Sequence, residues 1–222
     1  MANSPREFCV IGLGRFGTAV AETLMSLGHT VLGVDKDMDR VENVAPQLTH
    51  ALQLDATDEK ALQEIGWRNF DTVVVSLGPD QEQSILVTVH MKERGVRRVV
   101  AKARSPMHGK VLERVGADRV VYPEREMGVR VAHRIASPSI VDIIELSEGL
   151  SVVECVAPKA MIGKTLKELE LRARHGVTVL AVKRGDNLVS LVGPDSRLGK
   201  DDIMVVAGHT QDLAEFEGLL DT

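Results

Sequence analysis

The chain has 222 residues, of which 44% are hydrophobic and 27% charged, the composition of a soluble globular protein. Aromatic residues make up only 3% and the net charge is −5, so the chain lacks the stacking surfaces and the clustered positive charge that nucleic-acid binding needs. No apolar run approaches the ~20 residues that cross a bilayer, and the opening MANSPREF has no signal-peptide character. We therefore expect a cytoplasmic protein without a nucleic-acid partner.

The chain up to residue 122 alternates strand and helix patterns at a regular spacing. Six strands are predicted, over 7–11, 30–34, 50–54, 72–76, 98–102 and 119–122. Helices are predicted between them, over 17–27, 38–45, 58–65, 81–94 and 106–115. The apolar runs CVIG, TVVVS and VVAKA are typical of strands that are covered on both faces. The pattern predicts an α/β fold with a Rossmann-like, doubly wound parallel sheet.

A long helix is predicted next, over 123–136, and the run Ser137-Pro138-Ser139 breaks it. We place a hinge at 137–149, where the chain changes character. This gives a Rossmann domain over 1–136 that includes the long helix, and a small C-terminal α+β domain over 150–222.

The small domain is richer in strands than the first. Strands are predicted over 150–156, 177–183, 188–191 and 203–207, and helices over 165–172 and 211–220. The tripeptide GDN at 185–187 separates the two central strands and predicts a hairpin turn.

The segment Gly12-Leu13-Gly14-Arg15-Phe16-Gly17 follows the first predicted strand and opens the first predicted helix. That position gives a G-x-G-x-x-G string its specificity. Gly12 permits the tight turn, Gly14 lets the backbone approach a diphosphate, and Gly17 allows the helix to pack closely on the strand. The N–H groups at the start of the helix then face the anion, so we predict nucleotide binding rather than a purely structural turn.

Asp35 ends the second predicted strand, about 20 residues beyond the glycine motif, where an acidic side chain accepts hydrogen bonds from ribose hydroxyls. A carboxylate there repels a 2′-phosphate, which disfavours NADP. The alternative role for Asp35 is to cap the helix that follows.

The loops after the second to fifth strands complete the predicted crevice, because the carboxyl ends of parallel strands share one edge of the sheet. Asp55 stands where the adenine edge would lie, with an N-cap as its alternative role. With Phe16 of the glycine motif, the remaining candidates from these loops are Lys36, Asp37, Ala56, Thr57, Ser76, Leu77, Gly78, Lys102, Ala103 and Arg104.

Two charged residues set this site apart from a plain dinucleotide loop. Arg15 stands on the phosphate-binding turn, where it either pairs with terminal phosphates or a neighbouring subunit, or is simply solvated. Glu124 begins the long helix, where it is either an acid favoured by the helix dipole or a ligand of a metal ion held by phosphates.

Several segments together resemble the RCK family, the regulators of K⁺ conductance, and among them the KtrA/TrkA-type cytoplasmic subunits of bacterial K⁺ transporters. In the first domain these are CVIGLGRFG, GHTVLGVDKD, LDATDEKALQEIG, FDTVVVSLG and KVLERVGADRVVYPEREMG. In the second domain they are VVECVAP, MIGKTLKEL and GPDSRLGKDDIMVV. The resemblance covers nearly the whole chain.

The resemblance implies a regulatory subunit that is not an enzyme. Family members dimerise through the long helix, assemble into a ring, typically an octamer, and dock on the cytoplasmic face of a membrane K⁺-translocating subunit of the KtrB/TrkH kind. ATP, ADP or NAD(H) occupies the Rossmann crevice, in some cases with Mg²⁺ or another cation.

The resemblance also implies roles for individual residues. Arg15 would contact terminal phosphates, Asp35 the ribose, and Glu124 the cation near the γ-phosphate. Lys102, Arg104 and His108 would fall in nucleotide-facing loops. In some relatives cyclic di-AMP binds the C-terminal domain at its dimer interface, and the candidates for that ligand are Arg172, His175 and Pro194, for which surface charge and turn formation are the alternative.

An NAD-dependent oxidoreductase is the main alternative function. It would need an acid–base residue beside a substrate pocket, and none of the seven histidines pairs recognisably with a carboxylate in the sequence. A redox-sensing DNA-binding repressor is a second alternative, which lacks a helix-turn-helix segment and a basic face here.

Overall fold

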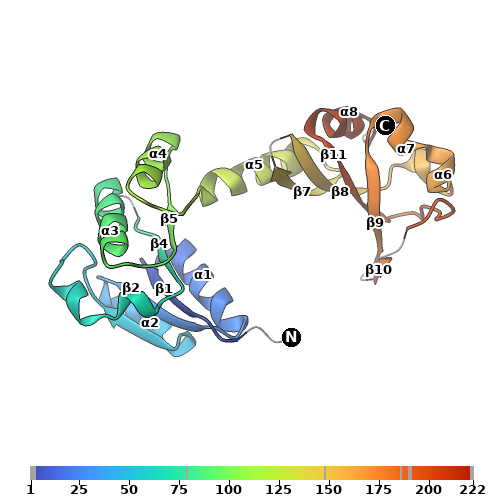
Figure 1. Cartoon of the computed structure of the whole chain (residues 1–222). Coiled ribbons are helices and arrows are strands. Elements are labelled where there is room, and N and C mark those ends of the chain that lie inside the picture. Colours follow the sequence, from blue (N-terminus) through green and yellow to red (C-terminus); the bar gives the residue numbers. More distant parts are fainter. Residues whose placement is uncertain (1–3, 79, 148, 186, 190–191, 221–222) are drawn as a thin grey trace. The chain divides into compact units, whose positions relative to one another are not determined.

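A computed structural model describes residues 4–78, 80–147, 149–185, 187–189 and 192–220 (Figure 1). The chain divides into two compact units, Met1–Glu124 and Arg125–Thr222. The division therefore falls in the first turn of the long helix, whereas we expected it after that helix, at 137–149. None of the helices in the described part of the chain is long and apolar enough to cross a membrane.

The first unit is built on a six-stranded parallel sheet. Its strands are β1 (Glu7–Ile11), β2 (Thr30–Asp35), β3 (His50–Gln53), β4 (Thr72–Val75), β5 (Val99–Lys102) and β6 (Arg119–Val121). The strand order is β3-β2-β1-β4-β5-β6 and every pairing is parallel. The predicted doubly wound fold is confirmed, and the order reverses between β1 and β4, where such sheets bind ligands.

Apolar side chains bury both faces of this sheet, as the continuous apolar runs predict. On β1, Cys9 and Ile11 belong to one buried cluster and Val10 to the cluster on the opposite face. The covering helices are α1 (Arg15–Ser26), α2 (Met38–Val44), α3 (Gln81–Glu93) and α4 (Pro106–Arg114), with 3-10 turns η1 (Ala45–Gln47), η2 (Ala61–Glu64) and η3 (Trp67–Asn69).

The α-helix predicted over 58–65 was wrong, because this segment forms only the 3-10 turn η2. The Asp55 carboxylate accepts a hydrogen bond from the Thr57 amide at 2.9 Å, and Asp58 accepts one from the Lys60 amide at 2.9 Å. Such local bonds compete with helical ones. The buried Trp67 ring then donates to the Leu62 carbonyl at 2.7 Å and holds the turn in place.

The second unit contains a five-stranded antiparallel sheet in the order β10-β9-β11-β8-β7. The strands are β7 (Ile140–Ser147), β8 (Leu150–Val156), β9 (Thr178–Arg184), β10 (Asn187–Val189) and β11 (Ile203–His209). The helices are α5 (Pro123–Ala136), which begins at the end of the first unit, α6 (Leu166–Leu169), α7 (Leu171–His175) and α8 (Thr210–Leu220), with the 3-10 turn η4 (Lys159–Met161). The prediction that the small C-terminal domain has an α+β fold is confirmed.

Two local predictions in the second unit were wrong. The segment 137–149, expected to be a linker, contains β7, whose Ile140 is buried and pairs with Cys155 of β8. The helix expected over 165–172 is split into α6 and α7, because Glu170 takes a left-handed conformation with φ 48°. In the predicted turn at 185–187, Asp186 lies outside the described residues, as do 190–191 at the end of the expected strand 188–191.

An ion pair between the buried Asp202 and the exposed Arg184 ties the loop before β11 to β9. The fully buried Asp202 accepts hydrogen bonds from the Arg184 guanidinium at 2.8 and 2.7 Å and from the Gly199 amide at 2.7 Å. The bonds from Arg184 lower the pKa of Asp202 below its ordinary value. Because the folded-state pKa is depressed, the pair stabilises the unit above the unfolded carboxyl pKa of about 3.9, and this stabilisation is lost as the pH falls further.

We therefore expect Asp202→Asn to lower the free energy of unfolding at pH 7 by about 2 kcal/mol, because the buried side chain loses its charge-assisted hydrogen bonds while Arg184 stays in contact with solvent. Urea unfolding at pH 7 and at several values below about pH 4 measures the effect, and the wild-type decline with acid should be shallower in the variant. Asp195→Asn, at an exposed position, is the matched control and should unfold like the wild type. Equal acid sensitivity of wild type and Asp202→Asn would contradict the assignment.

Candidate nucleotide-binding crevice

Packing demands two of the three motif glycines. Gly12 has a φ of +95°, and a Cβ added there would lie 2.4 Å from the Ser76 carbonyl oxygen. A Cβ at Gly17 would lie 1.9 Å from the Gly12 carbonyl oxygen. These two glycines therefore serve the close approach of α1 to the β1 turn and to the end of β4.

Gly14 differs from both, since its φ of −74° suits any residue and no protein atom lies within 4 Å of an added Cβ. It occupies the N-cap of α1, where no side chain caps the helix and the first turn carries no acidic residue. The first amides of α1 therefore have no side-chain cap, and a side chain at Gly14 would meet no other part of the protein. This is the arrangement that a diphosphate requires.

Asp35 is buried at the tip of β2, and its carboxylate is held by three groups. One oxygen accepts from the Leu13 amide at 2.7 Å and lies 3.5 Å from the Arg40 guanidinium, and the other accepts from the Asp37 amide at 3.0 Å. The alternative role, capping the next helix, belongs instead to Asp37, which accepts from the Asp39 amide. Asp35 therefore braces the glycine turn as well as standing at the predicted ribose position.

The loop after β3 lies beside Asp35, whose carbonyl accepts from the Leu54 amide at 2.9 Å. The Asp55 carboxylate bonds both the hydroxyl and the amide of Thr57, at 2.6 and 2.9 Å, and these bonds lower the pKa of Asp55. Ala56 between them is buried. The expected adenine-side loop is thus a self-bonded turn, in which Asp55 shapes the loop without capping a helix.

The end of β4 lies on the other side of β1 from β2. The Ser76 amide donates to the Ile11 carbonyl at 2.7 Å, which fastens the end of β4 to β1, and the Ser76 side chain is buried. Leu77 is half-buried and Gly78 is exposed. On the β2 side, Lys36 and Asp37 are also exposed.

Lys102, at the end of β5, connects the glycine turn to the start of α5. Its ammonium lies 2.5 Å from the Glu124 carboxylate and 5.7 Å from the centre of the Phe16 ring. The hydrogen bond from Lys102 lowers the pKa of Glu124, so this carboxylate is charged at neutral pH. The sequence left two roles open for Glu124, an acid favoured by the helix dipole or a metal ligand. The structure gives it a protein partner, Lys102.

The structure places His108 differently from the expected nucleotide-facing position. Its ring is buried, and Nδ1 accepts from the Arg104 amide at 3.3 Å, which leaves Nε2 to donate to the Ser84 hydroxyl at 2.8 Å. Burial, followed by the charge of Arg104, lowers the pKa of His108. His108 thus supports the loop after β5 from within, where Ala103 is buried too and the Arg104 side chain is exposed.

Arg15 is exposed on the first turn of α1. With Arg40 and the outer faces of α1 and α2 it lines a groove of about 430 Å³ beside the glycine turn. No cluster of three or more His, Cys, Asp or Glu side chains occurs in the described residues. A cation at Glu124 would therefore need phosphate oxygens as further ligands.

The TrkA-N domain model matches residues 8–123, and the TrkA-C domain model matches residues 150–221. The chain belongs to the TrkA family of potassium-uptake proteins. Ktr system potassium uptake protein C of Bacillus subtilis (strain 168) is 42% identical over 212 residues, which cover 96% of each chain. Ktr system potassium uptake protein A of the same organism is 37% identical with the same coverage.

A solved structure of the GsuK channel bound to NAD has the same fold. It superposes with a TM-score of 0.69 at 19% identity, over 98% of this chain and 40% of the channel chain. The family expected from the motifs is confirmed, and with it the assignment to potassium uptake rather than to the oxidoreductases.

Two of the three candidates for a second ligand, Arg172 and His175, lie on α7 of the TrkA-C domain, and Pro194 lies in the loop before β11. Arg172 is exposed on α7, the His175 ring lies 6.3 Å from the Phe216 ring of α8, and the Pro194 carbonyl accepts from the Lys167 amide at 2.8 Å. Arg172 and His175 are three residues apart on one helix, and in the described part of the chain no hydrogen bond or ion pair joins either of them to Pro194.

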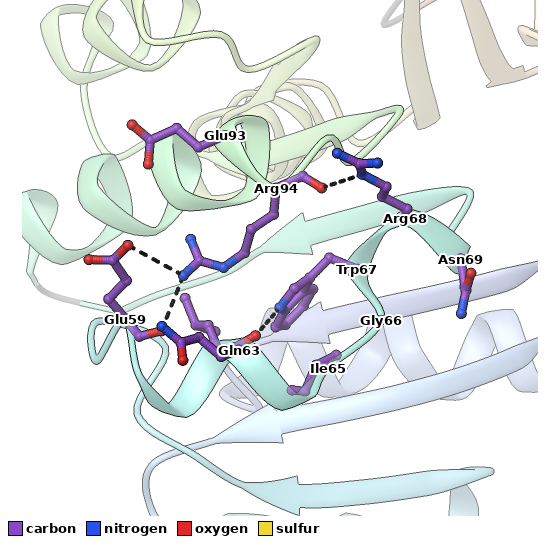
Figure 2. A pocket seen from close by; sticks show the side chains of 10 residues that line it. Glu59, Gln63, Ile65, Gly66, Trp67, Arg68, Asn69, Glu93 and Arg94 are labelled. Carbon is purple, nitrogen blue, oxygen red and sulfur yellow. Dashed lines mark hydrogen bonds and ion pairs between the residues drawn. The ribbon is translucent and has the colours of Figure 1, made fainter.

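A second hollow, of about 520 Å³, lies in the TrkA-N domain between the η2–η3 connection and the end of α3 (Figure 2). The polar groups around it are hydrogen-bonded to one another. Arg94 donates to the Glu59 carbonyl at 3.1 Å, and Arg68 donates to the Arg94 carbonyl at 3.4 Å. None of the predicted nucleotide residues lines it. We interpret this hollow as a result of how α3 packs against the η2–η3 connection.

Proposed function

We propose that this protein is a nucleotide-sensing cytoplasmic regulatory subunit that gates a membrane K⁺ uptake system. The observation that carries the proposal is the uncapped start of α1 over Gly14, beside the braced carboxylate of Asp35. The Ktr relatives, named as potassium uptake proteins and aligned over nearly the whole chain, supply the physiological setting.

ATP or ADP and NAD(H) are the ligands that this crevice suits. The diphosphate lies on the amides of α1, Asp35 serves the ribose of either ligand, and the NAD-bound GsuK channel shows that a protein of this fold binds a dinucleotide. Arg15 and Lys102 provide positive charge for terminal phosphates. If Mg²⁺ or another cation accompanies those phosphates, Glu124 would be its protein ligand.

Apolar exposure on α5 supports assembly into a homodimer. Met127, Val131 and Ile135 follow one another at four-residue spacing, and they are 53%, 43% and 76% exposed. Such a stripe on one helix face favours burial against a second copy. A closed ring, which we expect to be an octamer, needs a second interface, and the exposed Leu86 of α3 and Met107 of α4 are candidates for it. The ring docks on a KtrB/TrkH-like membrane subunit.

A ligand shifts such a ring only through its different affinity for two states. If each nucleotide favours one state by about 1 kcal/mol, eight concerted sites contribute about 8 kcal/mol, which exceeds the roughly 5.5 kcal/mol that moves an equilibrium from 1:99 to 99:1. A small preference at each site is therefore enough.

Calorimetric titration of the purified protein with ATP, ADP, NAD⁺, NADH and cyclic di-AMP, with and without Mg²⁺, tests the proposal. We expect at least one adenosine nucleotide to bind in the TrkA-N domain, and cyclic di-AMP to bind, if at all, near Arg172, His175 and Pro194. Failure of every nucleotide to bind would refute the proposal. Hydride transfer from NADH to a panel of small carbonyl substrates would favour the oxidoreductase alternative.

Arg15→Ala is expected to weaken ATP binding about 10-fold, because one charge-assisted contact to a terminal phosphate contributes about 1.5 kcal/mol. ADP affinity should change less than threefold, since the diphosphate contacts remain. The same titrations measure both constants. Arg97→Ala, which removes an exposed arginine before β5, is the control and should leave both unchanged. Equal losses for ATP and ADP would contradict the role of Arg15.

A further inference from the structure

Charged contacts join helix α5 to strand β7 of the second unit. None of its 14 residues is buried. Two of its arginines, Arg130 and Arg134, meet the carboxylate of Asp142 on β7. Arg130 bonds both carboxylate oxygens, with Nε 3.1 Å from Oδ1 and Nη2 against Oδ2, and Arg134 Nη2 lies 3.2 Å from Oδ2.

The Asp142 side chain is set into the protein more deeply than its partners. It is 17% exposed, against 38% for Arg130 and 49% for Arg134. Oδ1 also accepts from the Ile143 amide at 2.8 Å, and the register of β7 on β8 shifts between Ile140 and Asp142. The Arg130 bond lowers the pKa of Asp142, so the carboxylate is charged at neutral pH. A bidentate arginine–carboxylate pair has a defined geometry that a single ion pair lacks.

The other end of the same helix lies at the nucleotide crevice. Glu124, in the first turn of α5, is bonded to Lys102 at the end of β5. A terminal phosphate that approaches Lys102 competes with Glu124 for the ammonium group, so ligand binding acts directly on the start of α5. A continuous helix transmits displacement along its axis because its backbone is hydrogen-bonded throughout.

We propose that Asp142 is a positioning residue that makes β7 follow α5, so that a nucleotide-driven change at Glu124 reaches the C-terminal sheet. The inference rests on the proposed nucleotide-binding function. In this proposal the Arg130–Asp142–Arg134 cluster couples ligand binding to the C-terminal unit. The cluster does not contribute to the affinity for the ligand.

Hydrogen exchange with mass spectrometry on the full-length protein, with and without ATP, tests this coupling. We expect ATP to change exchange in peptides of β7 and β8 in the wild type. Asp142→Asn should reduce that change at least threefold, while the ATP dissociation constant shifts less than twofold. Glu145→Gln, which alters an exposed carboxylate on the same strand, should respond like the wild type.

Asp142→Glu keeps the charge and should restore at least half of the response, which a loss of folding in the C-terminal unit would not allow. A full ATP response in Asp142→Asn, or an equal loss in Asp142→Asn and Asp142→Glu, would overturn the inference. ATP binding to the wild type without any change in β7 would overturn it too and leave the proposed function standing. Absence of ATP binding to the wild type would remove both.

Discussion

Gly14→Ala is expected to weaken the binding of ATP and of NAD⁺ at least 100-fold while the protein stays folded. The added methyl group enters the open space over the first amides of α1, which the diphosphate needs for its hydrogen bonds. Charge-assisted bonds contribute about 1.5–3 kcal/mol each, and the loss of two of them accounts for the factor. Because the φ of −74° suits alanine, the free energy of unfolding should fall by no more than about 1 kcal/mol.

Gly17→Ala is the informative counterpart, because its Cβ would lie 1.9 Å from the Gly12 carbonyl oxygen. We expect this variant to lose about 3 kcal/mol or more of folding stability, since backbone must move. Urea unfolding and nucleotide titration of the two variants separate the roles. If Gly14→Ala unfolds as readily as Gly17→Ala, or binds ATP like the wild type, the open space over α1 is not a phosphate site.

Asp35→Ala should weaken every ribose-bearing ligand about 30-fold or more, and it should also weaken inorganic pyrophosphate. The first effect follows from the lost ribose contact, and the second from the lost bond between Asp35 and the Leu13 amide, which shapes the glycine turn. An unsatisfied buried amide costs about 1–3 kcal/mol, so the free energy of unfolding should fall by that amount as well.

Titration with ATP, NAD⁺ and pyrophosphate, together with urea unfolding, checks these expectations. Asp39→Asn, on the exposed first turn of α2, is the control and should bind all three like the wild type. Unchanged pyrophosphate binding in Asp35→Ala would show that Asp35 serves the ribose alone. Unchanged ATP binding would remove Asp35 from the site.

Most of the first unit could be predicted because its signals are local. A strand, a glycine turn and a helix follow one another in a few residues, and the apolar runs of β1, β4 and β5 show that both faces are covered. The prediction failed at 58–65, where Asp55 and Asp58 bond to amides two residues ahead. Whether such a bond or a helical turn forms depends on packing around Trp67, which no local pattern reveals.

In the site, the sequence identified candidate residues but not their partners. Asp35 was predicted as a ribose ligand, and its bond to Leu13 was missed because it joins the end of β2 to the glycine turn, 22 residues earlier in the chain. His108 was expected at the crevice, yet its ring is buried against Ser84 of α3. A residue number in a loop does not show which way a side chain points.

By itself, the sequence determined the fold class, the glycine cradle and the family, because these follow from short-range order in the chain and from motifs read in place. The tertiary structure alone decided that 140–147 is a strand, that Lys102 holds Glu124, and that Asp142 gathers Arg130 and Arg134. Each of these depends on a partner that folding brings close: an edge strand needs β8 to pair with, and a charge needs its counter-ion within a few ångströms.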